Sequence, residues 1–256
     1  MLSRIILIFL VWLLSGQPVL AAVSCSVLTQ NQDISNASSY ATASVTPSSN
    51  ALVLVATEQT RNAATACTDN DVSSVTGNGL TWVLIARQCF SDAGVPTHTV
   101  EIWRSMGASP STGAITIATG GASQVHMAWA VAECTGTDTS GTNGSGAIVQ
   151  SATNLIEPGT SLTVTLGAFG DAGNATLGAF GVADNVAVTE GTGFTEIAEQ
   201  LVSDGGLDSG LQVQWRNDND TTVDASWSSI DAGGVAIEIK AAATAADTSG
   251  DVLWFH

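Results

Sequence analysis

The sequence predicts an all-β protein, a two-sheet antiparallel β-sandwich of the jelly-roll or concanavalin-like type. Three observations lead to this prediction. Short apolar or alternating runs recur along the chain, with turn residues such as Gly, Asn, Asp and Ser between them. No long stretch has the apolar period of an amphipathic helix. Charged residues make up only 11% of the 256 residues, a composition that suits extracellular β-proteins.

The first half of the chain contains the clearest strands. Residues 51–56 are a continuous apolar run bounded by turn residues, which is typical of a buried strand. Residues 79–103 predict a hairpin of two Trp-bearing strands, and residues 57–78 before it a long connection. Residues 125–134 alternate large side chains with alanines, which predicts a central strand packed on both faces. Weaker strands are expected at residues 23–36 (as an edge strand), 40–45 and 114–119.

The second half repeats this pattern. Strands are expected at residues 161–166, 175–183, 194–200, 211–216, 222–227 and 234–240. Between the halves, residues 135–147 are mostly Gly, Ser and Thr and predict a long exposed loop, with a boundary between two domains as the alternative. Because each half is short for a sandwich of its own, we expect one domain over residues 23–240, followed by a tail at 241–256.

The N-terminus has the features of a secretory signal peptide, expected to span residues 1–22. Arg4 supplies the positive charge, residues 5–14 are apolar, and the small residues Ala21 and Ala22 follow. We therefore expect a secreted protein, located outside the cell or on its surface. The apolar run is shorter than the roughly 20 residues of a membrane-spanning helix, so the mature chain is expected to have no transmembrane segment.

Four cysteines follow the predicted signal peptide. An even number in a secreted chain favours two disulfide bonds, and three pairings are open. Cys67 and Cys89 flank the strand of Trp82, so one pairing joins these two cysteines and leaves Cys25 to bond Cys134. The spacing lacks the paired cysteines of a zinc site or of a redox motif.

The charge of the chain excludes one class of partner. The formal net charge is −17, from 6 basic and 23 acidic residues. Such a surface repels phosphate backbones, and no basic stripe offsets it, so nucleic acid is not an expected partner. The acidic excess favours solubility and the binding of cations.

Four short motifs resemble those of a known group of proteins. The motifs are Gly79–Trp82, Glu101–Trp103, Glu133–Gly136 and Val235–Lys240. They are similar to a β-sandwich domain of bacterial secreted and phage-associated proteins, over roughly residues 40–240. The resemblance implies a structural, adhesive or binding module and supplies no catalytic residues. Cys134 stands where that group has an aromatic residue, and a disulfide is the expected replacement for its packing.

Two carboxylates raise the question of glycoside hydrolysis. Glu101 and Glu133 lie in predicted strands beside Trp residues, and a glycosidase needs two carboxyl groups about 5–10 Å apart. The Glu-x-Asp-x-x-Glu arrangement common in jelly-roll glycosidases is absent. The alternative is that both carboxylates bond loop amides or pair with Arg87 or Arg104.

Serine hydrolase chemistry has less support. His98 and His126 lie in predicted strands, and the chain contains no Gly-x-Ser-x-Gly elbow. Structural histidines are therefore expected, and no catalytic residue is predicted.

Acidic loops supply the candidate binding residues. The candidate calcium ligands are Asp69, Asp71, Asp218 and Asp220, with solvated turns as the alternative because Asp and Asn favour turns. Among the Trp residues of predicted strands, Trp215 has Asp218 and Asp220 nearby and is the best candidate for stacking on a sugar, with core packing as the alternative.

The sequence therefore predicts a non-catalytic secreted structural, adhesive or assembly module, with glycans or copies of itself as candidate partners. A carbohydrate-binding module, with calcium as a candidate cofactor, is the second hypothesis. A glycoside-active enzyme that uses Glu101 and Glu133 is the third. The segment before Tyr40 is a candidate donor strand for self-assembly.

Overall fold

The computed structural model describes residues 22–61, 66–92, 95–120 and 123–243. These residues form strands β1 to β15 and two short 3₁₀ helices, η1 (Cys67–Asn70) and η2 (Ser145–Ala147). The predicted signal peptide lies outside the described residues except for Ala22, and so do residues 244–256 of the predicted tail. Within the described part of the chain, no helix has the length and apolar character needed to cross a membrane.

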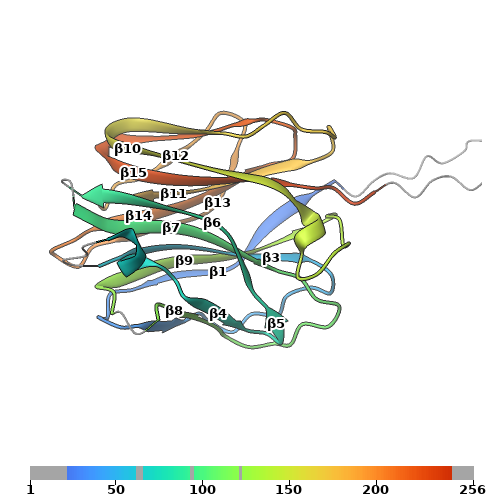
Figure 1. Ribbon diagram of the computed structural model, residues 1–256, viewed down its shortest axis with the longest axis horizontal. Coiled ribbons are helices and arrows are strands. Elements are labelled where there is room, and N and C mark those ends of the chain that lie inside the picture. The colour runs from blue at the N-terminus through green and yellow to red at the C-terminus, as the bar shows by residue number, and fades with distance from the viewer. Residues whose placement is uncertain (1–21, 62–65, 93–94, 121–122, 244–256) are drawn as a thin grey trace, which may run out of the picture.

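The strands form three antiparallel sheets, which Figure 1 shows as stacked layers. The N-terminal sheet has the order β1 (Ser24–Asp33), β9 (His126–Thr135), β3 (Leu52–Thr60), β7 (Val95–Ser105) and β6 (Val83–Asp92). The C-terminal sheet has the order β10 (Ile148–Thr165), β15 (Thr222–Ile239), β11 (Ala175–Val182), β14 (Ser209–Arg216) and β13 (Thr195–Val202), and β12 (Thr189–Glu190) also pairs with β15. The small sheet has the order β2 (Ser39–Ala41), β8 (Ile115–Ala118), β4 (Ser74–Gly77) and β5 (Leu80–Thr81).

The two large sheets pack face to face, so the predicted all-β sandwich is confirmed. Each sheet comes from one half of the chain, and the connection between the halves contains η2. Phe90 and Ile102 of the N-terminal sheet share one apolar core with Leu177 and Val235 of the C-terminal sheet. The two halves therefore depend on each other to bury these side chains.

The small sheet covers the other face of the N-terminal sheet. Trp129 and Met127 of β9 pack toward the small sheet, in one core with Ile117 of β8, whereas Ala128 and Ala130 pack toward the C-terminal sheet. This arrangement confirms the prediction that the alternation of residues 125–134 marks a central strand packed on both faces. Trp82 and Trp103 also belong to the core beside the small sheet, each with only 8% of its surface exposed.

A bent hairpin adds a third apolar cluster. β10 and β15 are each 18 residues long. The C-terminal end of β10 and the N-terminal end of β15 fold back together over the outer face of the C-terminal sheet. The fold-back needs glycines beneath it, because a Cβ at Gly178 would lie 2.5 Å from Val223 Cγ1 and one at Gly234 would lie 2.9 Å from Val164 Cγ2. The prediction of separate strands at residues 222–227 and 234–240 is wrong, since the turn-type residues between them form the bend of one strand.

Two other boundaries differ from the predictions. β3 continues to Thr60 instead of ending at residue 56, because its last, polar residues still pair with β7 and β9 and are buried. Residues 148–160 are the first part of β10, for which no strand was predicted. Ile148, Ala152 and Ile156 pack against the apolar cores, but polar residues between them interrupt the apolar pattern at this edge of the C-terminal sheet. The edge strand expected within residues 23–36 is confirmed as β1.

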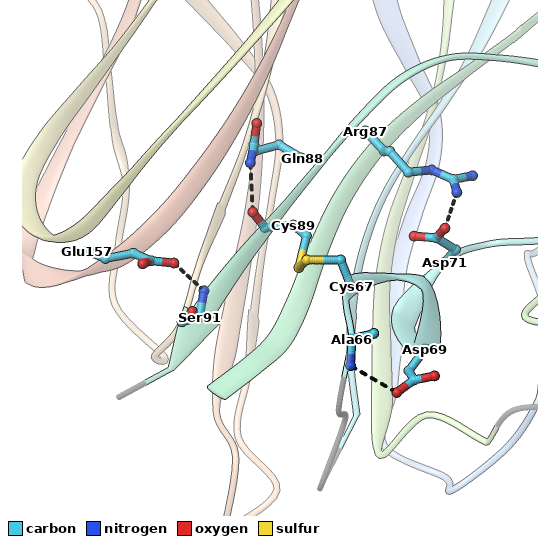
Figure 2. The surroundings of a disulfide bond; sticks show 9 residues. All are labelled: Ala66, Cys67, Asp69, Asp71, Arg87, Gln88, Cys89, Ser91 and Glu157. Atoms are coloured by element: carbon cyan, nitrogen blue, oxygen red, sulfur yellow. Dashed lines mark hydrogen bonds and ion pairs between the residues drawn. A yellow bond between two sulfur atoms is a disulfide. The ribbon is translucent and has the colours of Figure 1, made fainter. Parts of the chain in front are cut away.

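Two disulfides complete the fold, and they join the cysteines in one of the pairings that the sequence left open. Cys25 and Cys134 occupy opposed positions of β1 and β9. Cys67 and Cys89 join η1 to β6, as Figure 2 shows, with their Cα atoms 5.5 Å apart. The described residues contain no free cysteine.

Candidate functional site

A buried polar network connects the two large sheets. Glu58 of β3 lies at its centre, where Oε2 accepts a hydrogen bond of 2.5 Å from Ser209 Oγ and Oε1 lies 2.9 Å from His98 Nδ1. His126 Nε2 lies 2.9 Å from Ser209 Oγ. The other nitrogen, His126 Nδ1, lies 3.2 Å from Asp204 Oδ2. The network therefore joins residues of β3, β7, β9 and β14 and the loop before β14.

The order Asp204, His126, Ser209 has the connectivity of a hydrolase triad. Its surroundings do not suit catalysis, because the side chains of His126 and Ser209 are fully buried and the Ser209 hydroxyl donates to Glu58. Burial raises the pKa of Asp204, but the N–H groups of Gly206 and Leu207 and the bond with His126 outweigh it, so that the pKa is lowered overall. An ionised Asp204 suits a structural pairing with His126.

Sequence reasoning missed this network except for its histidines. The one local indication was the polar run Thr57–Thr60, which directly follows the apolar run 51–56 and is buried at the end of β3 between two neighbouring strands. Ser209 and Asp204 are distant in sequence from His126, which both of them contact. Nothing in the local pattern of either residue indicates that contact.

A second buried carboxylate faces the small sheet. Glu101 Oε1 accepts hydrogen bonds from Val72 N at 2.8 Å and Gln59 Nε2 at 2.9 Å, and Oε2 accepts one from Trp103 Nε1 at 2.7 Å. Arg87 Nε lies 3.6 Å from Oε1. Burial raises the pKa of Glu101 to about 7 against the opposing effects of Arg87, Val72 and Trp103. Glu101 thus bonds a backbone amide and pairs with Arg87, as the non-catalytic alternative expects.

Glu101 and Glu133 do not form a catalytic pair. Glu133 accepts hydrogen bonds from Ser48 N at 2.8 Å and Ser48 Oγ at 3.0 Å. Glu101 is opposite Thr57 of β3 and Glu133 is opposite Val53, so the two are separated by about 13 Å along the strands, at roughly 3.3 Å per residue. They also lie on opposite neighbours of β3. This exceeds the separation that glycoside hydrolysis needs.

The candidate calcium ligands near η1 bond to other groups of the protein. Figure 2 shows Asp71 in contact with Arg87 and Asp69 accepting a hydrogen bond of 3.1 Å from Ala66 N. Asp69 also lies 3.7 Å from Arg61. Across the described ranges, no group of three or more His, Cys, Asp or Glu side chains is placed to hold a metal ion.

Trp215 and Arg216, the residue to which Asp218 and Asp220 bind, lie on different faces of β14. Arg216 Nε lies 2.6 Å from the Asp218 carboxylate, and Arg216 Nη1 lies 2.8 Å from Asp220. Trp215 packs against the core between the large sheets, while Arg216 points to the other side, where it lies over the Phe194 ring. The structure therefore brings Asp218 and Asp220 together around Arg216 and does not place Trp215 beside them.

A surface groove of about 450 Å³ lies at the start of β10. Its lining consists of Gly146, Ile148, Val149, Gly170, Asp171, Asn174, Glu238 and Lys240. Asn174 Nδ2 donates to Glu238 Oε1 at 2.5 Å, and Gln150 Nε2 donates to Glu238 Oε2 at 2.6 Å. The hydrogen bond from Lys240 to Asp138 lowers the pKa of Asp138 to about 2. Sequence reasoning singled out no residue of this groove as a ligand-binding group.

Two edge strands carry the exposed apolar side chains. Among the described residues, the large apolar side chains that are exposed are Val27 (39%), Ile34 (56%), Val149 (50%) and Leu155 (39%). Each lies in or directly after β1 or β10, the edge strands of the N-terminal and C-terminal sheets. An edge strand leaves backbone N–H and C=O groups free to pair with another strand.

These edges also lack charge. β1 has no charged residue from Ser24 to Gln32, and β10 has none from Ile148 to Ile156, in a chain with 23 acidic residues. The opposite edge of the C-terminal sheet, β13, carries Glu196 and Glu199, a pattern that discourages strand pairing. Comparison with models of protein families, with curated proteins and with solved structures gives no match for this chain.

Proposed function

We propose that this protein is a non-catalytic structural or adhesive module of the cell exterior that assembles with copies of itself. The observation that carries the proposal is the location of the exposed apolar side chains on two uncharged edge strands. Natural β-proteins protect long edges with charges, proline or bulges. Each of these two edges has a shift of register, between Val27 and Thr29 in β1 and between Ile148 and Gln150 in β10, but neither has a charge there, and an edge without charge is suited to pairing. The resemblance to secreted and phage-associated sandwich domains points in the same direction.

The placement of the reactive groups supports a non-catalytic role. Glu101, His126 and Ser209 are fully buried, and their polar atoms form hydrogen bonds with other groups of the protein. Catalysis needs an acid, base or nucleophile within hydrogen-bond reach of a substrate. Since buried groups of this kind stabilise a fold, we assign them a structural role.

The disulfides support the extracellular setting and the durability of such a module. Both are compatible with an oxidising compartment. Cys25–Cys134 holds β1 in its own sheet, so the N-terminal segment serves as an edge for pairing and is not donated to a neighbour.

A carbohydrate-binding module is the second candidate, and the groove beside Asn174 favours it. Its lining offers carboxylate, amide and ammonium groups, which suit the hydroxyl groups of a sugar. The groove has no aromatic residue for stacking, and this is why self-assembly is the preferred function.

Sedimentation velocity on the purified, oxidised protein over a range of concentrations tests the proposal. The expected result is a mass that rises with concentration beyond that of the monomer, together with no binding on a glycan array with or without calcium. A protein that remains monomeric and binds a glycan, and that loses this binding in the Asn174→Ala variant, would replace the first function with the second.

A further inference from the structure

We infer that successive copies of this chain join head to tail, with β1 of one copy paired antiparallel to β10 of the next. The inference rests on the proposed self-assembly and identifies the surfaces that meet. The partner is a second copy of this chain, and the contact continues the N-terminal sheet of one copy into the C-terminal sheet of the next.

The two edges lie on opposite sides of the sandwich. β10 and β15 pack over β6, whereas β1 packs against β13. Since β6 and β1 are the two ends of the N-terminal sheet, the free edge of β10 is on the β6 side and the free edge of β1 is on the other. A contact between different edges on opposite sides is heterologous, and it repeats without closing unless the rotation forms a ring.

The strand directions allow an antiparallel pair. β9 and β15 end at the same end of the sandwich, because Thr137 bridges Ala241 and Asp138 N donates to Lys240 O at 2.9 Å. β1 is antiparallel to β9 and β10 is antiparallel to β15, so β1 and β10 run in the same direction within one copy. Rotation of the next copy by 180° about an axis that lies parallel to the sheets and perpendicular to the strands reverses the direction of its β10. The same rotation exchanges the positions of the two large sheets, so that β10 of the next copy lies in the same layer as β1.

The uncharged parts of the two strands match in length. Residues 24–32 and 148–156 are each nine residues long, about 30 Å at roughly 3.3 Å per residue. Two copies that each carry a formal charge of −17 repel one another, and contact through uncharged strands keeps their carboxylates away from the seam. The other two edges are less suitable, because β13 carries two glutamates and β6 carries Arg87 and Asp92.

The matched lengths give the full antiparallel overlap as the expected register. In that register Gln32 is opposite Ile148 and Thr29 is opposite Ser151, so the uncharged residues of the two strands lie against one another along their whole length.

Paired variants test the inference. Gln30→Glu with Asn31→Asp adds two negative charges to exposed positions of β1, and Ser151→Glu with Thr153→Glu does the same on β10. Ser226→Glu with Ser228→Glu adds the same charge to exposed positions of β15 away from both edges and is the matched control. Circular dichroism and thermal unfolding establish that each variant folds, and sedimentation velocity with negative-stain electron microscopy measures assembly.

The expected result is that the parent protein and the control form chains, and that each edge variant alone is monomeric. A 1:1 mixture of the two edge variants should stop at heterodimers, since it holds one intact β1 edge and one intact β10 edge. Edge variants that dimerise alone would overturn the inference in favour of twofold pairing of like edges. Assembly unchanged in both edge variants would overturn it while leaving the proposed function standing, and a monomeric parent protein would overturn both.

A cross-linking measurement keeps the test decisive if an edge variant fails to fold. Thr29→Cys and Ser151→Cys place a thiol on each strand at positions that meet in the full overlap. On mild oxidation of the mixed variants, disulfide-linked heterodimers are expected to exceed either homodimer at least tenfold. Heterodimers at only about twice the yield of either homodimer, the ratio that random pairing of an equal mixture gives, would overturn the inference.

Discussion

Cys25 and Cys134 are directly opposite each other in β1 and β9, with their Cα atoms 4.1 Å apart. This bond ties an edge strand, of which few side chains are buried, to a central strand of which nearly all are. The packing of β1 alone gives it little resistance to fraying. The disulfide therefore fixes the shape of the edge that the inference above assigns to assembly.

Removal of this disulfide should cost more stability than removal of the other. Cys25 and Cys134 are separated by 109 residues in sequence, and Cys67 and Cys89 by 22. Loop-closure entropy gives about 5 kcal/mol for the long loop and about 3 kcal/mol for the short one. Guanidinium unfolding of the double variants Cys25→Ser/Cys134→Ser and Cys67→Ser/Cys89→Ser measures both. A larger loss for the short loop would contradict the prediction.

Glu101 should make stability fall as the pH rises from about 4.5 to about 7. Its pKa is about 7 in the folded protein, against an ordinary value of 4.5. Below pH 4.5 both states hold the proton. Between the two values only the folded state holds it, so unfolding becomes easier, by about 3 kcal/mol in total.

The variant Glu101→Gln should remove this part of the pH dependence of stability. The measurement is the difference in unfolding free energy between pH 4.5 and pH 7.5, compared with the parent protein, because the slope is independent of any constant cost of the substitution. Gly170→Ala, which changes no titratable group and places a Cβ in open space, is the control and should keep the slope of the parent. An unchanged slope in Glu101→Gln would show that the buried carboxylate stays ionised.

Ser209→Ala should destabilise the protein by about 2–3 kcal/mol. The substitution leaves Glu58 Oε2 and His126 Nε2 buried without the hydroxyl that lies between them. Chemical denaturation measures the loss. Ser203→Ala, which removes an exposed hydroxyl 3.3 Å from Asp208, is the control and should change stability by less than about 0.5 kcal/mol. Equal effects of the two substitutions would argue against a structural role for the network.

Gly178→Ala should destabilise the fold-back of the bent hairpin. The new Cβ would lie 2.5 Å from Val223 Cγ1, and overpacking of this kind costs about 1–3 kcal/mol. Val223→Ala in the same chain should restore part of the loss, which a double-mutant cycle measures. Gly170→Ala, where a Cβ meets no atom within 4 Å, is the control. If the effects of the two substitutions on stability simply add, Val223 does not pack on Gly178, and the folded-back end of the hairpin lies elsewhere.

The local pattern of apolar and polar residues was sufficient to predict the main strands. The apolar run at 51–56 and the alternation at 125–134 each locate a buried strand, because a strand that is buried on both faces carries apolar or small side chains at consecutive positions. The pairing of Cys67 with Cys89, one of those that the sequence left open, is the one observed, although Cys89 lies within β6 and not beyond its end.

The remaining features depend on contacts between distant residues. Glu58 and Ser209 are 151 positions apart, so their hydrogen bond has no local indication in either segment. The bend in β15 lies at residues that usually mark turns, and pairing with the distant strands β10 and β11 keeps them in a strand. Trp215 resembles an exposed residue because acidic neighbours follow it, but the strand period sends its ring to the core.

Because each large sheet of the sandwich comes from one half of the chain, the two sheets become available for folding one after the other during synthesis. Once residues 24–135 have emerged, the N-terminal and small sheets can enclose their shared core. The opposite face of the N-terminal sheet, with Leu54, Ile102 and Ala130, stays in contact with water until residues 148–239 arrive. A nascent chain of this kind is most vulnerable to aggregation halfway through its production, when this apolar face of the N-terminal sheet has been made and its cover has not.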